Sequence, residues 1–318
     1  MGVWSYLLRR LVQVPLVILF VTIIIFALMK VTPGDPISIM LGPYSTPETV
    51  AALRAQYHLD QPFVMQYLLW VRDLFRGDFG SSIRSKELVV DLVAARFPVS
   101  LTLAGVATLV SVLVAIPAGV FAAYRKNSWW DYLLMGTATV GLSIPTFTLG
   151  LVLILIFALK LQWVPISGIG LRTVSDGLWP PIQPYLLPIS ALAAGSVAEL
   201  ARVIRASMLE VLDQDYIRTA RAEGMNDMEI IRVHALKNAL IPVITVVAIT
   251  FAFQVGNTLT VEYLFSIPGL GSALIAAVIN RDFPVIQGLT LVVGLVFIAT
   301  NLLADVSYAI VDPRVRYN

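Results

Sequence analysis

The side chains able to do chemistry are few and far apart. The chain has no cysteine, and its two histidines, His58 and His234, belong to no H-E-x-x-H pair of the kind that binds zinc in proteases. No lysine follows a glycine, so the G-x-x-x-x-G-K-[ST] loop that holds nucleotide phosphates is missing. We therefore expect no catalytic site, metal or cofactor in this chain, and we expect His234 to pack or hydrogen-bond.

Acidic and amide side chains interrupt the apolar stretches at a few places. Glu199, Glu262 and Asp305 lie near the ends of apolar stretches, where snorkelling or pairing between helices is a commoner role than proton or ion coupling. Three amides lie deeper, and they either line a pathway or hold helices together, which is the commoner use. These candidates for pathway lining are Gln254, Asn257 and Asn301.

One polar stretch stands out in the second half, DQDYIRTARAEGMNDMEIIRVHALKNALIP over residues 213–242. Asp213 or Asp215 is expected to cap a short helix, which Gly224 ends because glycine adopts the left-handed conformation without a Cβ penalty. Asn226 with Glu229 three residues later is typical of a capping box that starts a second helix. We call this helix–glycine–helix segment, about residues 213–238, the bracket.

The bracket is predicted to dock onto another protein. Ile217, Met225 and Met228 have no obvious internal partner and are expected to be exposed, and exposed apolar clusters mark interaction surfaces. Ala220 is expected on the docking face of the first helix.

The elements around the bracket are predicted to be membrane helices. Hydrophobic residues make up 58% of the 318 residues and charged residues 13%, too apolar a balance for an ordinary soluble domain. Six windows lack Asp, Glu, Lys and Arg, and each has the roughly 20 residues needed to cross a bilayer as a helix. They are Leu11–Met29, Phe97–Tyr124, Tyr132–Leu159, Gly177–Ala198, Asn238–Val261 and Phe283–Ala304.

The predicted fold is therefore an all-α bundle of six transmembrane helices. The expected parts are an N-terminal segment with the first span (1–31), an external helical loop (32–96) and a core with five spans (97–318) that carries the bracket. Within the loop, Thr46 and Pro47 predict the start of a helix running to about Tyr57. An apolar stripe follows at helical spacing, which predicts a helix lying on the membrane or against other spans. The stripe consists of Phe63, Tyr67, Trp70, Val71 and Leu74.

Two features of the core are also predicted. The run from Gly141 to Pro145 predicts a kink in the third span, and the fourth span is expected to continue as a helix to Leu212. Basic residues before the first span, between spans two and three, around the bracket and after the last span predict that both termini and the bracket are cytoplasmic. Asn127 is then cytoplasmic and Gln162 external. The first span shows no cleavage site, so it is expected to be retained.

The bracket resembles the coupling loop of binding-protein-dependent ABC importer permeases. That family's pattern is an acidic residue, two alanines, three variable residues and glycine, then nine variable residues and Ile-x-Leu-Pro. Ala220, Gly224 and Leu236 match it, whereas Arg218 and Thr219 depart from it at the acidic residue and the first alanine. The form YIRTARAEG followed by HALKNALIPV is similar to the dipeptide, oligopeptide and nickel branch of the family, and the similarity extends over nearly the whole chain.

The resemblance implies one permease subunit of an importer, working with a second, similar permease, two cytoplasmic ATP-binding subunits and an external substrate-binding protein in the cell membrane. It implies that ATP hydrolysis belongs to those partners and that the cargo is a di- or oligopeptide, with nickel, glutathione or an oligosaccharide as alternatives. A transporter driven by a proton or sodium gradient is the rival from another class; it predicts inverted repeats and mid-span acids. The residues assigned to coupling are Tyr216, Ile217, Arg218, Thr219, Ala220, Arg221, Ala222, Glu223, Gly224, Met225 and Met228.

Overall fold

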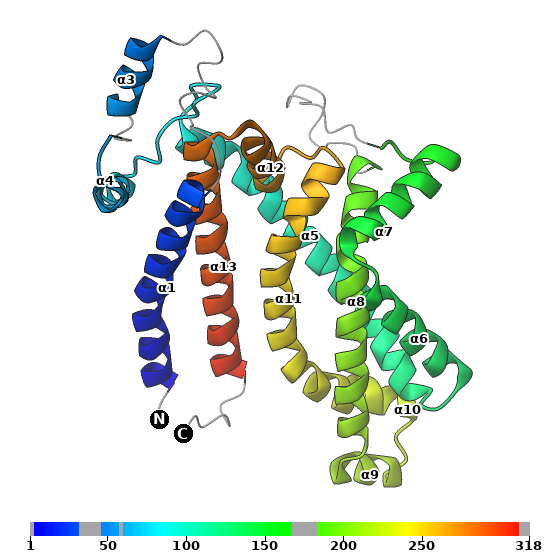
Figure 1. The fold of residues 1–318 in the computed structure, drawn as a ribbon. Coiled ribbons are helices and arrows are strands. Elements are labelled where there is room, and N and C mark those ends of the chain that lie inside the picture. The colour runs from blue at the N-terminus through cyan, green and yellow to red at the C-terminus, as the bar shows by residue number, and fades with distance from the viewer. Residues whose placement is uncertain (1–2, 32–45, 57–59, 167–182, 312–318) are drawn as a thin grey trace, which may run out of the picture. The chain divides into compact units, whose positions relative to one another are not determined.

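The computed structural model describes residues 3–31, 46–56, 60–166 and 183–311, with side chains over 12–27, 46–55 except 53, 60–166 and 183–303. Over these ranges the chain is helical apart from turns and one isolated β-bridge between Ser81 and Leu88 (Figure 1). The elements are α1 (Val3–Val31), α3 (Pro47–Gln56), α4 (Phe63–Phe75), α5 (Val89–Tyr124), α6 (Trp129–Ser143), α7 (Thr146–Leu153), η2 (Ile154–Lys160), α8 (Gln183–Leu212), α9 (Asp215–Ala222), α10 (Asp227–Glu229), η4 (Ile230–Ala235), α11 (Leu236–Leu264), α12 (Leu270–Asn280) and α13 (Phe283–Val311).

Contacts divide the chain into two units. The first contains Leu101–Ile267 with the chain ends Met1–Leu8 and Ala299–Asn318, and the second contains Arg9–Ser100 with Pro268–Ile298. The division falls inside α1, α5 and α13, and the boundary expected at residues 96 and 97 lies within α5.

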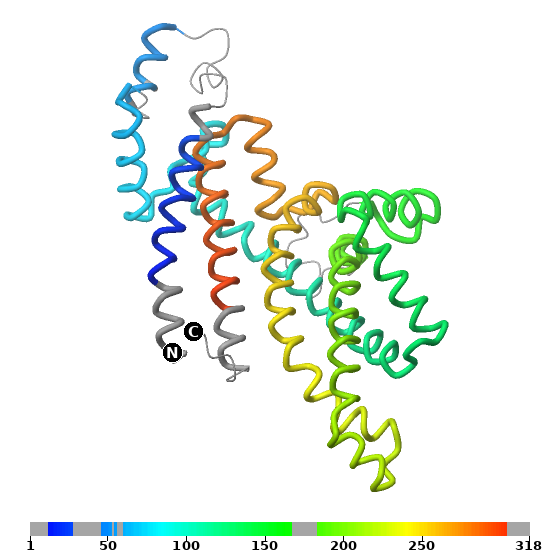
Figure 2. The backbone as a smooth tube through the Cα atoms, turned by 60° about the horizontal axis from the view of Figure 1, so that its bottom comes forward, coloured from blue at the N-terminus to red at the C-terminus, as the bar shows by residue number. Residues whose placement is uncertain are grey.

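The first unit is built on α8 and α11, which pack together (Figure 2). The helix α5 crosses α8 very closely at Gly119, where an added Cβ would lie 2.6 Å from the carbonyl oxygen of Ala201 and 2.8 Å from Ile204 Cβ. Only glycine permits this approach, and small residues at helix crossings are how membrane helices pack without a hydrophobic drive between them. As predicted, α8 continues as a helix to Leu212.

The predicted kink at Gly141–Pro145 is a full break. The helix axis changes direction by 103° between α6 and the helix formed by α7 and η2. Ile144 is extended at φ −94° and ψ 118°, as expected because a following proline disfavours the helical conformation. Beyond the break α7 packs on α8 and α11, and Gly150 lies so close to the end of α11 that an added Cβ would be 2.7 Å from Leu264 Cδ2 and 3.2 Å from Phe265 Cε2.

The second unit joins α1 to the loop that follows it. The ring of Phe26 in α1 lies 5.2 to 5.7 Å from the rings of Phe63, Tyr67 and Trp70 in α4, and the Thr22 and Tyr67 hydroxyls are 3.0 Å apart. Of the two positions left open for this stripe, the structure places it against a span. The preceding helix α3 starts where predicted, with Thr46 Oγ1 accepting from the Thr49 N–H at 3.3 Å.

A latch in the second unit fastens the turn before α5 to the turn before α13. Asp282 is buried, and its carboxylate accepts from the Ser82 hydroxyl at 2.5 Å and the Ile83 N–H at 3.1 Å. Close by, Val89, Leu270 and Leu289 are buried in one small apolar core. The helix α12 runs from Leu270 to Asn280 and contributes Leu270 and Ala277 to this core.

The all-α membrane fold is confirmed. Within the described residues, four helices are long and apolar enough to cross a bilayer, and the bent pair α6–η2 makes a fifth if counted as one span. The described part of α1 adds a shorter apolar stretch, Val12–Ala27, at the place of the predicted first span. The first residues of the predicted fourth span, 177–182, lie outside the described ranges.

Candidate functional site: the bracket

The bracket follows directly on α8. Its first helix, α9, begins at Asp215 with Gln214 as the N-cap residue, and no side chain caps it. The expected capping by Asp213 or Asp215 is wrong: Gln214 turns the chain with its backbone, donating to Val211 O and accepting from the N–H groups of Ile217 and Arg218. Asp215 instead places its charge in the first turn, where the helix dipole favours an acid.

Gly224 ends α9 in the left-handed conformation that the sequence predicts, with φ at +89°. The Met225 N–H donates to Ala220 O at 3.2 Å and the Gly224 N–H donates to Arg221 O at 3.1 Å. These two bonds are those of a Schellman motif, which satisfies the last carbonyls of a helix and fixes the direction in which the chain leaves.

The second helix of the bracket, α10, has Asn226 as its N-cap residue, and the Asn226 side-chain oxygen accepts from the Glu229 N–H at 2.9 Å. This is one of the two bonds of the predicted capping box. After the short α10 the chain passes through a π-helical turn, η4, directly into α11. Such turns are rare and frequently lie at functional sites. The bracket is thus continuous with a long apolar helix at each end, α8 and α11.

One side of the bracket is buried in the same apolar core as the membrane helices. Ile217 is fully buried, Ala220 is nearly so, and Met225 packs against them. The expectation that Ile217 and Met225 are exposed, and that Ala220 faces a partner, is therefore wrong. Their partners come from distant parts of the chain, and the core they share is lined by Ala115, Ala123, Leu200, Ala201, Ile204, Met208, Ile230, Ile231, Ala235, Ala239 and Val243.

The other side of the bracket is open. Three large apolar side chains are exposed on it: Tyr216 (43%), Met228 (51%) and Val233 (57%). Sequence reasoning missed Val233, although Ile231, Ala235, Ala239 and Val243 recur every four residues and mark the buried face, from which Val233 is offset. The other predicted coupling residues that are exposed are Arg218, Thr219, Arg221, Ala222, Glu223 and Gly224.

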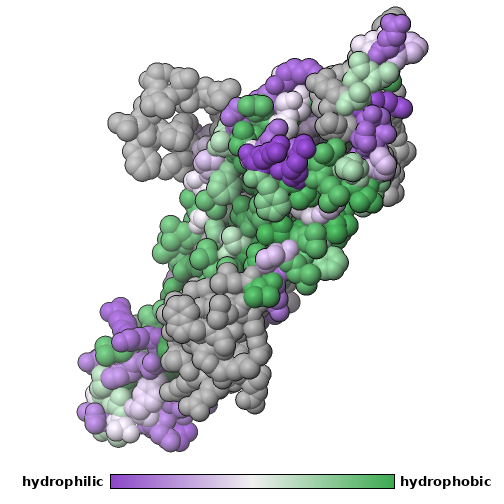
Figure 3. Space-filling view, turned by 90° about the vertical axis from the view of Figure 1, so that its left-hand side faces the viewer, coloured by the Kyte–Doolittle hydropathy of each residue, from purple (hydrophilic) through white to green (hydrophobic). Residues whose placement is uncertain are grey.

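The open side carries charges of both signs. Arg218 lies 3.2 Å from Asp215 and Arg221 lies 3.5 Å from Asp227, and because all four are well exposed these pairs add little stability. Their charges remain available to a partner. In the space-filling view the bracket, lowest in Figure 1, shows hydrophilic side chains with hydrophobic ones among them (Figure 3).

A hydrogen bond connects the first helix of the bracket, α9, to the start of α11. The Asn238 amide at the start of α11 donates to the Tyr216 hydroxyl of α9 at 3.0 Å and to the His234 carbonyl at 3.0 Å. His234 itself is half-buried, consistent with a packing role. The hydrogen bond to Asn238 holds Tyr216 in place while its ring stays exposed.

The three pathway candidates lie in different surroundings. Gln254 of α11 is 1% exposed, and its amide donates to Leu192 O at 2.9 Å and to Ser196 Oγ at 3.1 Å, both in α8. Asn257 is exposed, and Asn301 is half-buried in α13. Gln254 thus joins two helices in this conformation, and pathway lining by the three stays a prediction.

The acids near the span ends differ as well. Glu262 is fully buried, so it does not snorkel, whereas Glu199 is exposed. The side chain of Asp305 lies outside the described residues. Across the described ranges, no group of three His, Asp or Glu residues is placed to hold a metal ion.

The fold is a bundle of membrane helices, and its polar bracket is rooted in the core of three of them. The comparison with known families agrees: the family described as "Binding-protein-dependent transport system inner membrane component" matches residues 115–317, and its N-terminal companion matches residues 3–104. The chain belongs to this family of ABC transporter permeases.

Curated relatives match along nearly their whole length. A Brucella abortus (strain 2308) protein described as a peptide transport system permease is 41% identical over 314 residues, 99% of each chain. The oligopeptide transport system permease protein AppB of Bacillus subtilis (strain 168) is 38% identical over 98% of this chain and 99% of its own.

Solved structures confirm the fold at lower identity. The inward-facing MetNI methionine ABC transporter matches with a TM-score of 0.52 and 18% identity, covering 69% of this chain and 97% of that one. An amino acid ABC transporter solved with histidines matches with a TM-score of 0.50 and 18% identity, covering 69% and 94%.

Proposed function

We propose that this chain forms half of the translocation pathway of an ATP-driven peptide importer and that the bracket is where a cytoplasmic ATPase subunit pushes on it. The chain itself makes and breaks no covalent bond. A second, similar permease, two ATPase subunits and an external binding protein complete the importer. Peptide cargo is supported by relatives about 40% identical over almost the whole chain, which are named as peptide or oligopeptide permeases.

The observation that carries the proposal is the two-sided construction of the bracket. Its inner side shares one apolar core with α5, α8 and α11. Protein cores are close-packed and transmit strain. A displacement of the bracket should therefore move all three helices instead of being absorbed in a flexible loop.

The outer side has the chemistry of a docking surface. Tyr216, Met228 and Val233 offer apolar area, and exposed arginines lie close to them in the sequence. Large apolar and arginine side chains are the usual anchors of protein interfaces. The partner that fits is a protein with an apolar groove and charges of both signs at its rim.

We expect the purified chain to be inactive alone. Reconstituted in liposomes, it should neither hydrolyse ATP nor accumulate a radiolabelled dipeptide. Co-expressed with the partner genes of its own locus, it should co-purify with an ATPase and support uptake that requires ATP and persists with ionophores. Uptake by the single chain driven by an imposed proton or sodium gradient would contradict the proposal and support the rival transporter.

We further expect the α5–α6 turn to face the cytoplasm and the end of η2 to face outward. Asn127 and Gln162, the natural test positions, both have left-handed backbones, with φ of 60° and 53°, so cysteine there would be strained. Lys126 and Lys160 are exposed neighbours that make a matched pair. On intact cells an impermeant maleimide should label Lys160→Cys and not Lys126→Cys, and permeabilised cells should label both. The opposite pattern would reverse the orientation.

A further inference from the structure

The helix α6 packs closely on α8, but few of its side chains are fully buried there. Its two buried side chains are Asp131 and Ala138, and at Gly141 an added Cβ would lie 3.7 Å from Ala198 Cβ of α8. No large apolar side chain of α6 is buried. A seam of small residues lets two helices approach but does not by itself select a register, so the acid is the distinctive element of this contact.

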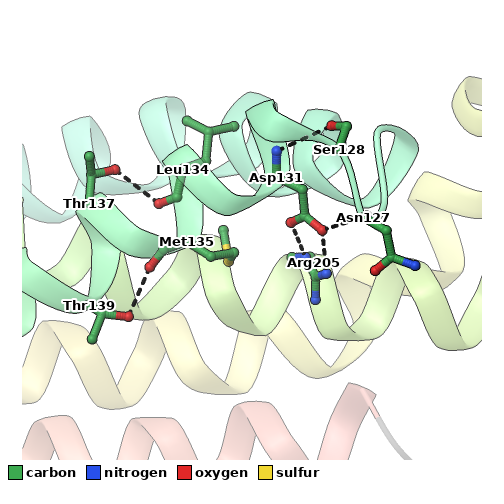
Figure 4. A network of polar contacts seen from close by, with 8 residues as sticks. All are labelled: Asn127, Ser128, Asp131, Leu134, Met135, Thr137, Thr139 and Arg205. Carbon is green, nitrogen blue, oxygen red and sulfur yellow. Dashed lines mark hydrogen bonds and ion pairs between the residues drawn. The ribbon is translucent and has the colours of Figure 1, made fainter.

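Asp131 makes a two-bonded ion pair with Arg205 of α8 (Figure 4). The arginine Nε donates to Oδ1 at 2.6 Å and Nη2 donates to Oδ2 at 2.6 Å. Asp131 is 2% exposed and Arg205 is 25% exposed in their side chains. Planar two-bonded pairs fix geometry as well as adding energy.

The turn before α6 is shaped around this carboxylate. Asn127 adopts a left-handed conformation and its N–H donates to Asp131 Oδ2 at 3.0 Å. The Ser128 hydroxyl accepts from the Asp131 N–H at 3.4 Å, capping the helix. A buried charge is tolerated only when partners with good geometry surround it, and here a guanidinium, a backbone N–H and the positive end of a helix do so.

Arg205 lies on the part of α8 that carries the bracket. Its neighbours Ile204 and Met208 are buried in the core shared with the bracket, and α8 ends at Leu212, where the bracket begins. At the other end of the α6–α7 arm, Gly150 rests against Leu264 and Phe265, at the end of α11 remote from the bracket. The segment α6–α7, residues 129–153, therefore connects the bracket end of α8 to the far end of α11.

We propose that Asp131 and Arg205 form a clamp that makes α6 move with the bracket-bearing end of α8, so that a displacement of the bracket reaches the far end of α11 through α6 and α7. The clamp stays closed throughout the transport cycle. Asp131 and Arg205 are thus positioning residues for coupling, and this inference rests on the proposed function of the bracket. A pair that must open during the cycle is the alternative that the experiment separates.

The experiment uses the assembled transporter and the absence of native cysteine. The double variant Asp131→Cys/Arg205→Cys should retain its ATPase subunits and hydrolyse ATP, while peptide uptake per ATP falls roughly 2- to 30-fold, the range for substitutions that weaken coupling between sites. Bifunctional methanethiosulfonates of graded length should restore uptake at the length that spans the pair. Monofunctional reagent and each single cysteine give the background.

Two further variants keep the result interpretable. Arg205→Lys retains the charge but loses the planar fork, so it should lower uptake per ATP less than the double variant does. Thr139→Val is the matched control, because the Thr139 hydroxyl bonds only within α6, to Met135 O at 2.8 Å (Figure 4), and it should transport normally.

Three results would overturn the clamp. If cross-linking blocks uptake, the pair must open during the cycle. If the double variant couples normally without a cross-link, the pair is dispensable. If neither Arg205→Lys nor the double variant assembles, the pair serves folding. Failure of the proposed function itself looks different, since the unmodified chain would then not co-purify with an ATPase.

Discussion

Valine in place of Gly224 should lower ATP-driven uptake roughly 5- to 30-fold while leaving the chain inserted and paired in the membrane. Gly224 has φ of +89°, and a side chain there would meet no atom within 4 Å, so the effect is conformational and not a clash. A left-handed conformation costs an L-residue about 1–2 kcal/mol, and β-branched residues are genuine outliers there. That cost disfavours the native bracket conformation roughly 5- to 30-fold. The chain can avoid it only if α9 continues past residue 223, which changes the direction in which the chain leaves the helix.

Two matched substitutions isolate the cause. Gly224→Asn should keep most of the uptake, because asparagine visits the left-handed region readily and also serves at this helix-end position. Gly105→Val adds the same side chain to a helical glycine of α5 that also has open space around it, and it should be nearly neutral for coupling. The measurements are dipeptide uptake and ATPase co-purification from equal amounts of membrane-inserted protein. Normal uptake by Gly224→Val would contradict the role given to the bracket.

The parts of the bracket that sequence reasoning predicted correctly are those determined by neighbouring residues. Gly224 ends a helix and Asn226 starts one because a backbone turn needs only four to six residues to close its hydrogen bonds. The break before Pro145 and the start of α3 at Pro47 are local in the same way. Each of these signals is carried by a residue with a special backbone preference.

The parts that sequence reasoning missed depend on residues far apart in the chain. Ile217 was expected on the surface because nothing near it in sequence covers it, yet Ala115 and Ala123, about a hundred positions away, belong to the core that buries it. Asp131 meets Arg205 across 74 positions and Ser82 meets Asp282 across 200. The π-helical turn η4 has no known signature in its residues, and it was also missed. A single sequence gives periodicity, and periodicity does not say which apolar faces meet.

The burial of Ala220 and the exposure of Met228 predict opposite consequences for the same added charge. Ala220→Glu places a carboxylate in the apolar core that roots the bracket. Leaving a charge buried without a partner costs about 3–5 kcal/mol. This variant should lower the melting temperature of the purified chain and lose uptake because the bracket itself is disordered. If Ala220 touched the partner instead, Ala220→Glu would give a stable chain that fails to bind.

Met228→Glu and Val233→Glu change side chains that point away from that core. Substitutions on an exposed surface usually alter stability by no more than about 0.5 kcal/mol, so both variants should melt as the unmodified chain does. If these side chains sit in the ATPase groove, each should weaken co-purification and uptake on the order of tenfold, since interface anchors contribute more than about 1 kcal/mol each. Gln214→Glu adds the same charge at an exposed polar position of the bracket, outside the residues assigned to coupling, and serves as the control. An equal loss of co-purification and uptake in all three variants would point to charge alone. A partner seated on Met228 and Val233 has no room for a carboxylate, so normal binding by the first two variants would place the docking surface elsewhere.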